Sequence, residues 1–243
     1  MIITLNNKTL VKSLLALIFL FVFTVVPFFY GCDSDDDENT THAGFDTYFP
    51  MNQGNRWSFN VSSEEEQGAG EAEVKAGASF NGYDSIPLQL TETSGQGLGS
   101  GLVYITADTS RADVLGARYE ADTLVLDQPF NFLNFPLEVG KSWFSDAGIT
   151  VEGVQITILA ETVVVAQENI TVSGMSYTHC FKLTSDITVT AIIVIPISVD
   201  LHLTMWLAPD IGPVKALAEV PELPLFPEIP TGTITVELTE TNF

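Results

Sequence analysis

Apolar and polar residues alternate with a period of two along much of the chain after residue 45. The clearest stretch is 197–205, where Ser198, Asp200, His202 and Thr204 alternate with Ile197, Val199, Leu201, Leu203 and Met205. Successive side chains of a β-strand point to opposite faces, so this pattern predicts a half-buried strand. Residues 149–165 and 232–238 predict further strands, and no stretch after residue 32 predicts an amphipathic helix. The sequence therefore predicts an all-β fold.

The nearly continuous apolar run 187–207 has the length of a membrane-spanning helix. Pro196, Asp200 and His202 interrupt it, and its other residues are rich in Val, Ile and Thr. These β-branched residues favour strands, and charged groups are costly within a bilayer. We therefore interpret the run as strand rather than membrane helix.

The N-terminus has the form of a secretory signal. Lys8 and Lys12 carry its only charges, and the apolar run Leu14–Tyr30 follows. A cationic start before an apolar stretch is typical of a leader that is removed after export. The run is also about long enough to cross a bilayer, so an uncleaved membrane anchor is the alternative.

The run ends at Gly31-Cys32, followed by an acidic stretch that begins at Asp33. A small residue before cysteine at this place resembles the lipobox of bacterial lipoproteins. Phe29 and Tyr30 are bulkier than the residues usually found there. The resemblance implies cleavage after Gly31 and a lipid on the Cys32 thiol. That lipid would anchor the chain to a membrane. The chain would then lie in the bacterial cell envelope, in the periplasm or on the cell surface.

These features divide the chain into three parts. Residues 1–31 are the expected lipoprotein signal peptide, and residues 32–44 are the lipidated cysteine and an acidic tether too poor in apolar groups to fold. Residues 45–243 are expected to form one β-rich domain.

A repeated motif indicates that this domain is built from two related halves. Residues 49–57 (FPMNQGNRW) and 135–143 (FPLEVGKSW) share the pattern Phe-Pro-apolar-x-x-Gly-polar-x-Trp. Proline fits where no ladder donor is needed, glycine permits a turn, and tryptophan brings a large buried surface to the start of a strand. We expect halves of about 45–130 and 131–243.

Two segments together resemble a group of bacterial lipoproteins. Residues 48–57 resemble their N-terminal Phe-Pro…Gly-x-x-Trp motif, and residues 206–215 (WLAPDIGPVK) resemble their W-x-A-P-x-x-G-x-V-K signature. Residues 163–183 resemble the strand pair before that signature. The chain is similar to TapB-type lipoproteins and more distantly to LolA/LolB-like folds. This resemblance implies a curved antiparallel sheet, or incomplete β-barrel, around a hydrophobic interior. No catalytic residue comes with it.

The charge of the chain argues against nucleic acid and anionic lipid as partners, and its cysteine content argues against a disulfide. The formal net charge is −22, with only nine Lys and Arg, and two of these lie in the leader. So few cations argue against binding nucleic acid or anionic lipid surfaces. Cys180 has no second cysteine to pair with once Cys32 is lipidated, so no disulfide is expected. A lone cysteine among apolar residues is usually a small buried side chain rather than a nucleophile.

No known catalytic motif occurs, and no cofactor is expected. Asp200 and His202 lie on one predicted strand face, about 7 Å apart. With His179 from a neighbouring strand they could ligate a metal or form an acid–base pair, although polar residues on an outward strand face are common. We therefore expect no catalytic and no cofactor-binding residues, and His179, Asp200 and His202 are the only candidates for metal ligands.

Two groups of apolar residues are candidates for binding. Trp57, Trp143 and Trp206 are expected to be core anchors, with stacking on a ligand as the alternative. Prolines every third residue indicate a polyproline II strut, formed by Pro221, Leu223, Pro224, Phe226, Pro227, Ile229 and Pro230. The strut either packs on its own sheet or offers an apolar ridge to a partner.

Three functions remain open at this point. A non-catalytic envelope lipoprotein could bind an apolar or amphipathic ligand inside the curved sheet. A structural or adaptor lipoprotein could dock an envelope protein through its surface or the proline strut. A metal-binding protein or hydrolase is the third alternative and would need His179, Asp200 and His202 to converge.

Overall fold

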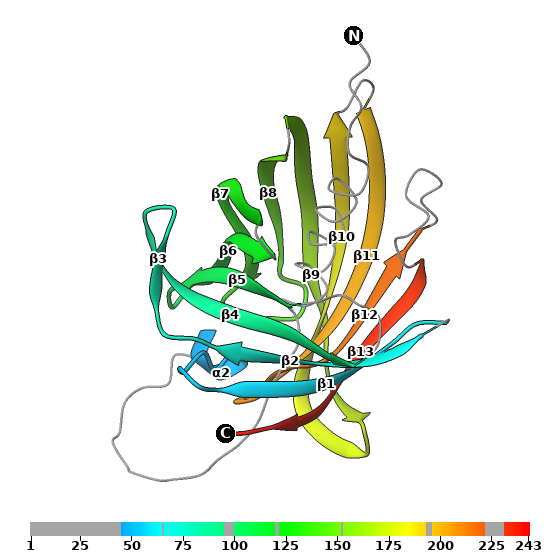
Figure 1. Ribbon diagram of the computed structural model, residues 1–243. Coiled ribbons are helices and arrows are strands. Elements are labelled where there is room, and N and C mark those ends of the chain that lie inside the picture. Colours follow the sequence, from blue (N-terminus) through cyan, green and yellow to red (C-terminus); the bar gives the residue numbers. More distant parts are fainter. Residues whose placement is uncertain are drawn as a thin grey trace.

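The computed structural model describes residues 45–64, 66–94, 100–119, 122–151, 153–192, 196–221 and 231–243. Among them lie one short helix, α2 (Phe45–Tyr48), and thirteen strands (Figure 1). The strands are β1 (Arg56–Ser62), β2 (Gln67–Val74), β3 (Ala78–Phe80), β4 (Tyr83–Ser94), β5 (Ser100–Ala107), β6 (Arg111–Tyr119), β7 (Asp122–Asn134), β8 (Ser142–Val151), β9 (Val154–Val172), β10 (Met175–Ile192), β11 (Pro196–Ala208), β12 (Gly212–Val220) and β13 (Gly232–Thr241). The predicted all-β fold is confirmed.

All the strand pairs are antiparallel, in the order β7-β6-β5-β4-β2-β1-β13-β12-β11-β10-β9-β8, with β3 paired to β4. The sheet curls until its two edge strands, β7 and β8, lie beside each other, which makes a nearly closed barrel with one unsealed seam. The predicted incomplete β-barrel is therefore confirmed. In Figure 1 β8 to β11 stand side by side as a tall arm, while β1, β2 and β13 cross below them.

The meander gives the barrel two distinct ends. Turns after β1, β4, β6, β8, β10 and β12 lie at one end, which we call the rim. Turns after β2, β5, β7, β9 and β11 lie at the other end, which we call the base, together with α2 and the start of β1. Successive strands alternate in direction, so consecutive turns must fall at opposite ends.

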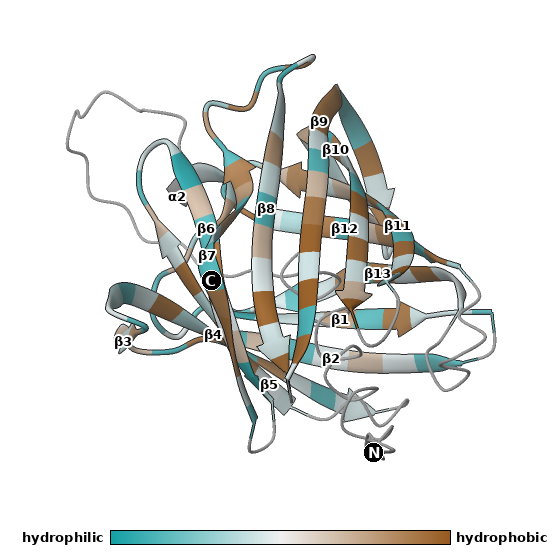
Figure 2. Cartoon of the chain, turned by 90° about the horizontal axis from the view of Figure 1, so that it is seen from above, coloured by the Kyte–Doolittle hydropathy of each residue, from teal (hydrophilic) through white to brown (hydrophobic). Residues whose placement is uncertain are grey.

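The alternation seen in the sequence separates an apolar inner face from a polar outer face. Along β8, every second residue from Trp143 to Val151 is buried, and the residues between them are exposed apart from the half-buried Gly148. Figure 2 shows the same banding of hydropathy along the long strands. The buried side chains form one continuous hydrophobic cluster that reaches through nearly the whole barrel.

Aromatic side chains close the base. Tyr48, at the end of α2, stacks on Phe135 at 6.5 Å and meets Phe181 edge-on at 5.4 Å. Phe49 is 1% exposed and its ring lies 6.4 Å from that of Trp57. The residues just before β1 are thus part of the core, and they fill the base of the barrel.

The two copies of the Phe-Pro…Trp motif make the same turn. In the first, the Gly54 N–H donates to the Val74 carbonyl at 2.9 Å; in the second, the Gly140 N–H donates to the Val164 carbonyl at 2.8 Å. Both glycines have positive φ, +92° and +91°, which glycine adopts without strain. One motif leads into β1 and the other into β8. The duplication of whole halves stays a prediction.

Side-chain hydrogen bonds hold the seam between β7 and β8. Gln128 Nε2 donates to Asp146 Oδ2 at 2.6 Å, and the Gly148 N–H donates to Asp127 Oδ1 at 2.6 Å. The Ser145 hydroxyl donates to a backbone carbonyl of β7. At this seam such side-chain bonds take the place of the backbone ladder that joins each other pair of neighbouring strands.

Several strand predictions can be compared directly. Residues 197–205 lie within β11 and 232–238 within β13, so both strands are confirmed. The single strand predicted at 149–165 is wrong, because the chain turns after Val151 and Gly153 has a φ of +82°. The run 187–207 is likewise two strands, β10 and β11. None of the helices in the described part of the chain is long and apolar enough to span a membrane.

Candidate functional site

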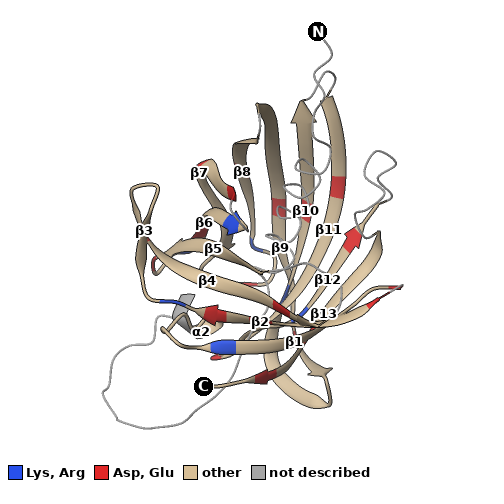
Figure 3. Cartoon of the chain, viewed as in Figure 1, with Lys and Arg blue, Asp and Glu red and all other residues tan. Residues whose placement is uncertain are grey.

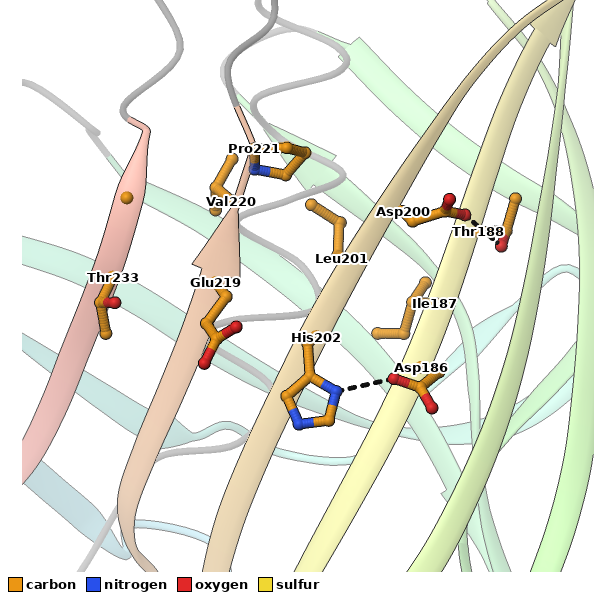
Figure 4. Close-up of a pocket in the computed structure, with 11 residues that line it drawn as sticks. Asp186, Ile187, Thr188, Asp200, Leu201, His202, Glu219, Val220, Pro221 and Thr233 are labelled. Carbon is orange, nitrogen blue, oxygen red and sulfur yellow. Dashed lines mark hydrogen bonds and ion pairs between the residues drawn. The ribbon is translucent and has the colours of Figure 1, made fainter.

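A cavity of about 580 Å³ opens at the rim, beside the part of β11 that extends past β12 (Figure 4). In the ladder between β11 and β12, the described pair nearest the rim is His202 and Glu219. Strand β12 ends one residue later, at Val220. Since Leu201 is level with Val220, five residues of β11, Pro196–Asp200, project past the end of β12, about 17 Å at the usual rise per residue. The cavity fills the resulting notch between β10 and β11 on one side and the ends of β12 and β13 on the other.

The floor of the cavity is apolar and belongs to the inner face of the barrel. Ile187 and Leu201 are cross-strand partners and are 3% and 8% exposed, while Val220 is 4% exposed. All three belong to the main hydrophobic cluster. The cavity is thus a place where the inner face meets the surface.

The border of the cavity is polar and acidic. His202 Nδ1 lies 2.7 Å from Asp186 Oδ1, and the Thr188 hydroxyl donates to Asp200 Oδ1 at 2.7 Å (Figure 4). Glu219 is the cross-strand partner of His202 on its other side. No Lys or Arg is among the lining residues. Figure 3 shows acidic segments on β10, β11 and the end of β12. The potential at the cavity mouth is therefore negative.

The pair between His202 and Asp186 contributes little to stability. The Asp186 side chain is 81% exposed and that of His202 is 40% exposed, so water screens the charges. Exposed ion pairs contribute about 0–1 kcal/mol. The bond between His202 and Asp186 can therefore break with little loss of stability.

The structure brings together two of the three metal candidates. Asp200 and His202 line the cavity, as the strand pattern predicted for their shared face. His179 lies elsewhere, at an irregularity between β9 and β10 near the base, where its backbone N–H donates to Asn169 Oδ1 at 3.0 Å. Among the described residues, no three His, Cys, Asp or Glu side chains are placed to hold a metal ion.

Asp186 and Glu219, which complete the acidic border, were not found from the sequence. Each lies directly opposite His202 on a neighbouring strand. Their position depends on the strand register, for which the sequence carries no local signal here.

The three tryptophans all have buried rings. Trp57 is fully buried beneath the base aromatics, and Trp143 is 7% exposed on the inner face of β8. Trp206 is 8% exposed; its Nε1 donates to Glu168 at 2.7 Å and Lys182 Nζ lies 5.1 Å from its ring. All three belong to the main hydrophobic cluster.

A row of polar groups interrupts the apolar inner face one residue below the cavity floor. Trp143, Thr162 and Ser185 are directly opposite one another across β8, β9 and β10, and all are buried. The hydroxyls of Thr162 and Ser185 lie 2.8 Å apart. The Trp143 Nε1 is buried, and no described residue forms a hydrogen bond with it. Thr162 and Ser185 were not found from the sequence, because their pairing depends on the strand register.

Cys180 is an unreactive thiol in the folded protein. It is fully buried, and this burial raises its pKa to about 11, with the negative charge of Glu168 adding to the rise. The thiolate is the nucleophilic form of cysteine, so little of it forms near neutral pH.

Several predicted features fall outside the described residues. They are the cleavage position Gly31, the lipidation residue Cys32 and the proline strut from Leu223 through Pro224, Phe226, Pro227 and Ile229 to Pro230. Pro221, which begins the strut, lines the cavity.

The fold occurs in solved structures of very different sequence. An exported protein with a YmcC-like fold from Bacteroides fragilis superposes with a TM-score of 0.51 at 13% identity, covering 81% of this chain and 99% of that chain. A lipoprotein from Parabacteroides distasonis gives a TM-score of 0.52 at 10% identity, covering 81% and 98%. The hypothetical lipoprotein YmcC from Escherichia coli gives 0.38 at 8% identity, covering 76% and 83%.

At these identities the likeness to the Bacteroides fragilis and Parabacteroides distasonis proteins shows a shared fold and nothing more. No family model and no curated protein matches the sequence.

Proposed function

We propose that the chain is a non-catalytic lipoprotein of the bacterial cell envelope that binds an amphipathic ligand in the rim cavity. The lipobox-like Gly31-Cys32 supports the lipid anchor. Two proteins of the same fold are described as exported or as a lipoprotein, which agrees with an envelope location. The resemblance to TapB-type lipoproteins remains part of this proposal.

The cavity is the observation that carries the ligand-binding function. Its floor is a continuation of the apolar inner face, and its border is polar. Its volume lies within the usual range for small-molecule sites, about 300–1,000 Å³. An apolar chain can therefore lie over Ile187 and Leu201 while a polar part stays at the border.

Extraction of the purified chain with organic solvent, followed by mass spectrometry, tests the proposal. Thr233 is exposed and lines the cavity, so Thr233→Trp places an indole over the opening without repacking the core. Thr123 is an equally exposed threonine at the start of β7, away from the cavity, and Thr123→Trp is the matched control.

We expect a stoichiometric amphiphile to copurify with the wild-type chain and with Thr123→Trp, and to be lost from Thr233→Trp. A wild-type chain that carries no such molecule and binds no apolar fluorescent probe would contradict the ligand-binding function.

An adaptor function is the second candidate, and one exposed apolar patch favours it. Phe144 on β8 is 76% exposed and Leu159 on β9 is 51% exposed. The two are diagonal neighbours on the outer face, because Phe144 is opposite Glu161 and Leu159 is opposite Asp146. Exposed apolar side chains that adjoin one another are typical of docking surfaces. Crosslinking from a photoreactive residue at position 144 in cells would capture such a partner.

A further inference from the structure

We propose that Trp143, Thr162 and Ser185 bind an uncharged carbonyl group of the ligand, so that the ligand is a neutral acyl compound such as an ester or amide lipid. This inference rests on the proposed ligand-binding function. The inference adds the chemical class of the ligand. It also places the carbonyl group of the ligand on the base side of the rim cavity.

The starting observation is a buried donor without an acceptor. Trp143 is 7% exposed, and its Nε1 has no hydrogen-bond partner among the residues that the structure describes. Leaving a buried donor unsatisfied costs about 1–3 kcal/mol, and nearly all buried polar groups in native proteins have partners. A ligand oxygen would recover this cost, which is the ordinary reason for such a group to persist inside a binding site.

The strand register connects this donor to the rim cavity. Trp143 is directly opposite Thr162, and Thr162 is directly opposite Ser185. Ser185 lies two residues from Ile187 on the same face of β10, about 7 Å toward the base. The row therefore begins one inner-facing residue below the cavity floor and extends across two strand spacings, about 10 Å, to the indole.

The donors in this row suit a carbonyl oxygen. An indole N–H can only donate, and a hydroxyl both donates and accepts. When Ser185 is the donor in its bond with Thr162, the Thr162 hydrogen is left to be donated elsewhere. That hydroxyl and the Trp143 indole are then two donors on adjacent strands, and they match the two lone pairs of one carbonyl oxygen.

The surroundings favour a neutral head group over an ionised one. The buried polar and charged residues of the described chain include no Lys or Arg. An ionised carboxylate or phosphate in this interior would lack a cation, and burying an unpaired charge is far more costly than burying a hydrogen-bonded neutral group. Aliphatic residues such as Ala160, Ile158 and Val189 continue the inner face toward the rim, and an acyl chain would lie along them.

Three probes with nearly equal chains separate these possibilities: methyl oleate, oleate and 1-heptadecene. Affinities would be measured by displacement of an apolar fluorescent probe from the full chain held in amphipol. We expect methyl oleate to bind more tightly than either oleate or 1-heptadecene. Trp143→Phe keeps an aromatic ring but removes the N–H donor. We expect it to weaken methyl oleate binding about three- to tenfold, the effect of one hydrogen bond. Binding of 1-heptadecene should not change.

Two further variants separate recognition from folding. Thr162→Val removes a hydroxyl at nearly constant shape and should also reduce the preference for the ester. Trp206→Phe is the matched control, because it removes an indole donor that binds Glu168 instead of facing the inner polar row. Trp143→Phe and Trp206→Phe lose the same side-chain volume from buried positions, so their thermal midpoints in the ligand-free protein are compared with each other.

Equal loss of ester and hydrocarbon binding in both Trp143→Phe and Thr162→Val would overturn the inference, as would tighter binding of oleate than of methyl oleate. Binding of 1-heptadecene as tight as that of methyl oleate by the wild-type chain would overturn it while leaving the proposed function in place. Binding of none of the three probes would overturn both.

Discussion

The clearest test of the fold is the packing of the residues that precede β1. Phe49 is 1% exposed, and its ring lies 6.4 Å from Trp57 and 5.9 Å from Phe132. Phe49→Ala would remove most of a buried aromatic side chain and leave a cavity at the base. Such substitutions cost about 3–5 kcal/mol. For a domain of this size each kcal/mol lowers the thermal midpoint by about 2–4 °C, so we expect a fall of about 6–20 °C.

Phe144→Ala is the matched control, because Phe144 is 76% exposed. The same chemical change there should alter stability by no more than about 0.5 kcal/mol. Both variants would be compared with the wild-type chain by thermal and urea unfolding, followed by circular dichroism. If Phe49→Ala were within about 1 kcal/mol of Phe144→Ala, the residues before β1 would not be part of the core, and the base of the barrel would not be closed as described.

Three further predictions follow from single residues. Gly116→Ala should destabilise the fold far more than Gly54→Ala in urea unfolding, because a Cβ at Gly116 would lie 2.2 Å from a backbone carbonyl, whereas one at Gly54 would meet nothing within 4 Å. Cys180 should react with a thiol reagent only on unfolding at pH 8; since its folded pKa of about 11 exceeds the ordinary thiol value of 9.0, its contribution to stability is full below pH 9 and is lost as the pH rises toward 11. Asp127→Ala should speed amide exchange of Gly148, whose N–H it accepts at 2.6 Å, and equal exchange in both proteins would show that this bond does not hold the seam.

The strand pattern of the sequence was enough to predict the fold class. The alternation over 197–205 identifies the two faces of β11, because burial on one side requires a period of two. The Phe-Pro…Trp motifs marked the starts of β1 and β8, and the turn in residues 206–215 lies between β11 and β12. Local chemistry decides each of these features, and local chemistry can be read from the chain.

Strand boundaries and cross-strand neighbours could not be predicted in the same way. The turn between β8 and β9 lies inside an apolar stretch, and Gly153 alone marks it. The cavity and the inner polar row both depend on which residues are opposite each other. Asp200 and His202 share a strand and could be paired by spacing, whereas Asp186 and Glu219 reach His202 only through the register. Register follows from the packing of the whole sheet rather than from any one segment.

The barrel is closed in two different ways, and this determines where it can most easily widen. An antiparallel ladder with one bulge, between Ser58 and Phe59, joins β1 to β13 from Trp57 to Ser62. Side-chain bonds such as that from Gln128 to Asp146 join β7 to β8. Separating the first pair breaks several backbone hydrogen bonds together, whereas separating the second breaks a few exposed bonds that water can replace. The inner polar row begins at Trp143 on β8, at the edge of this seam. Opening β7 from β8 would therefore enlarge the interior beside the indole while leaving the ladders around β11 and the rim cavity in place.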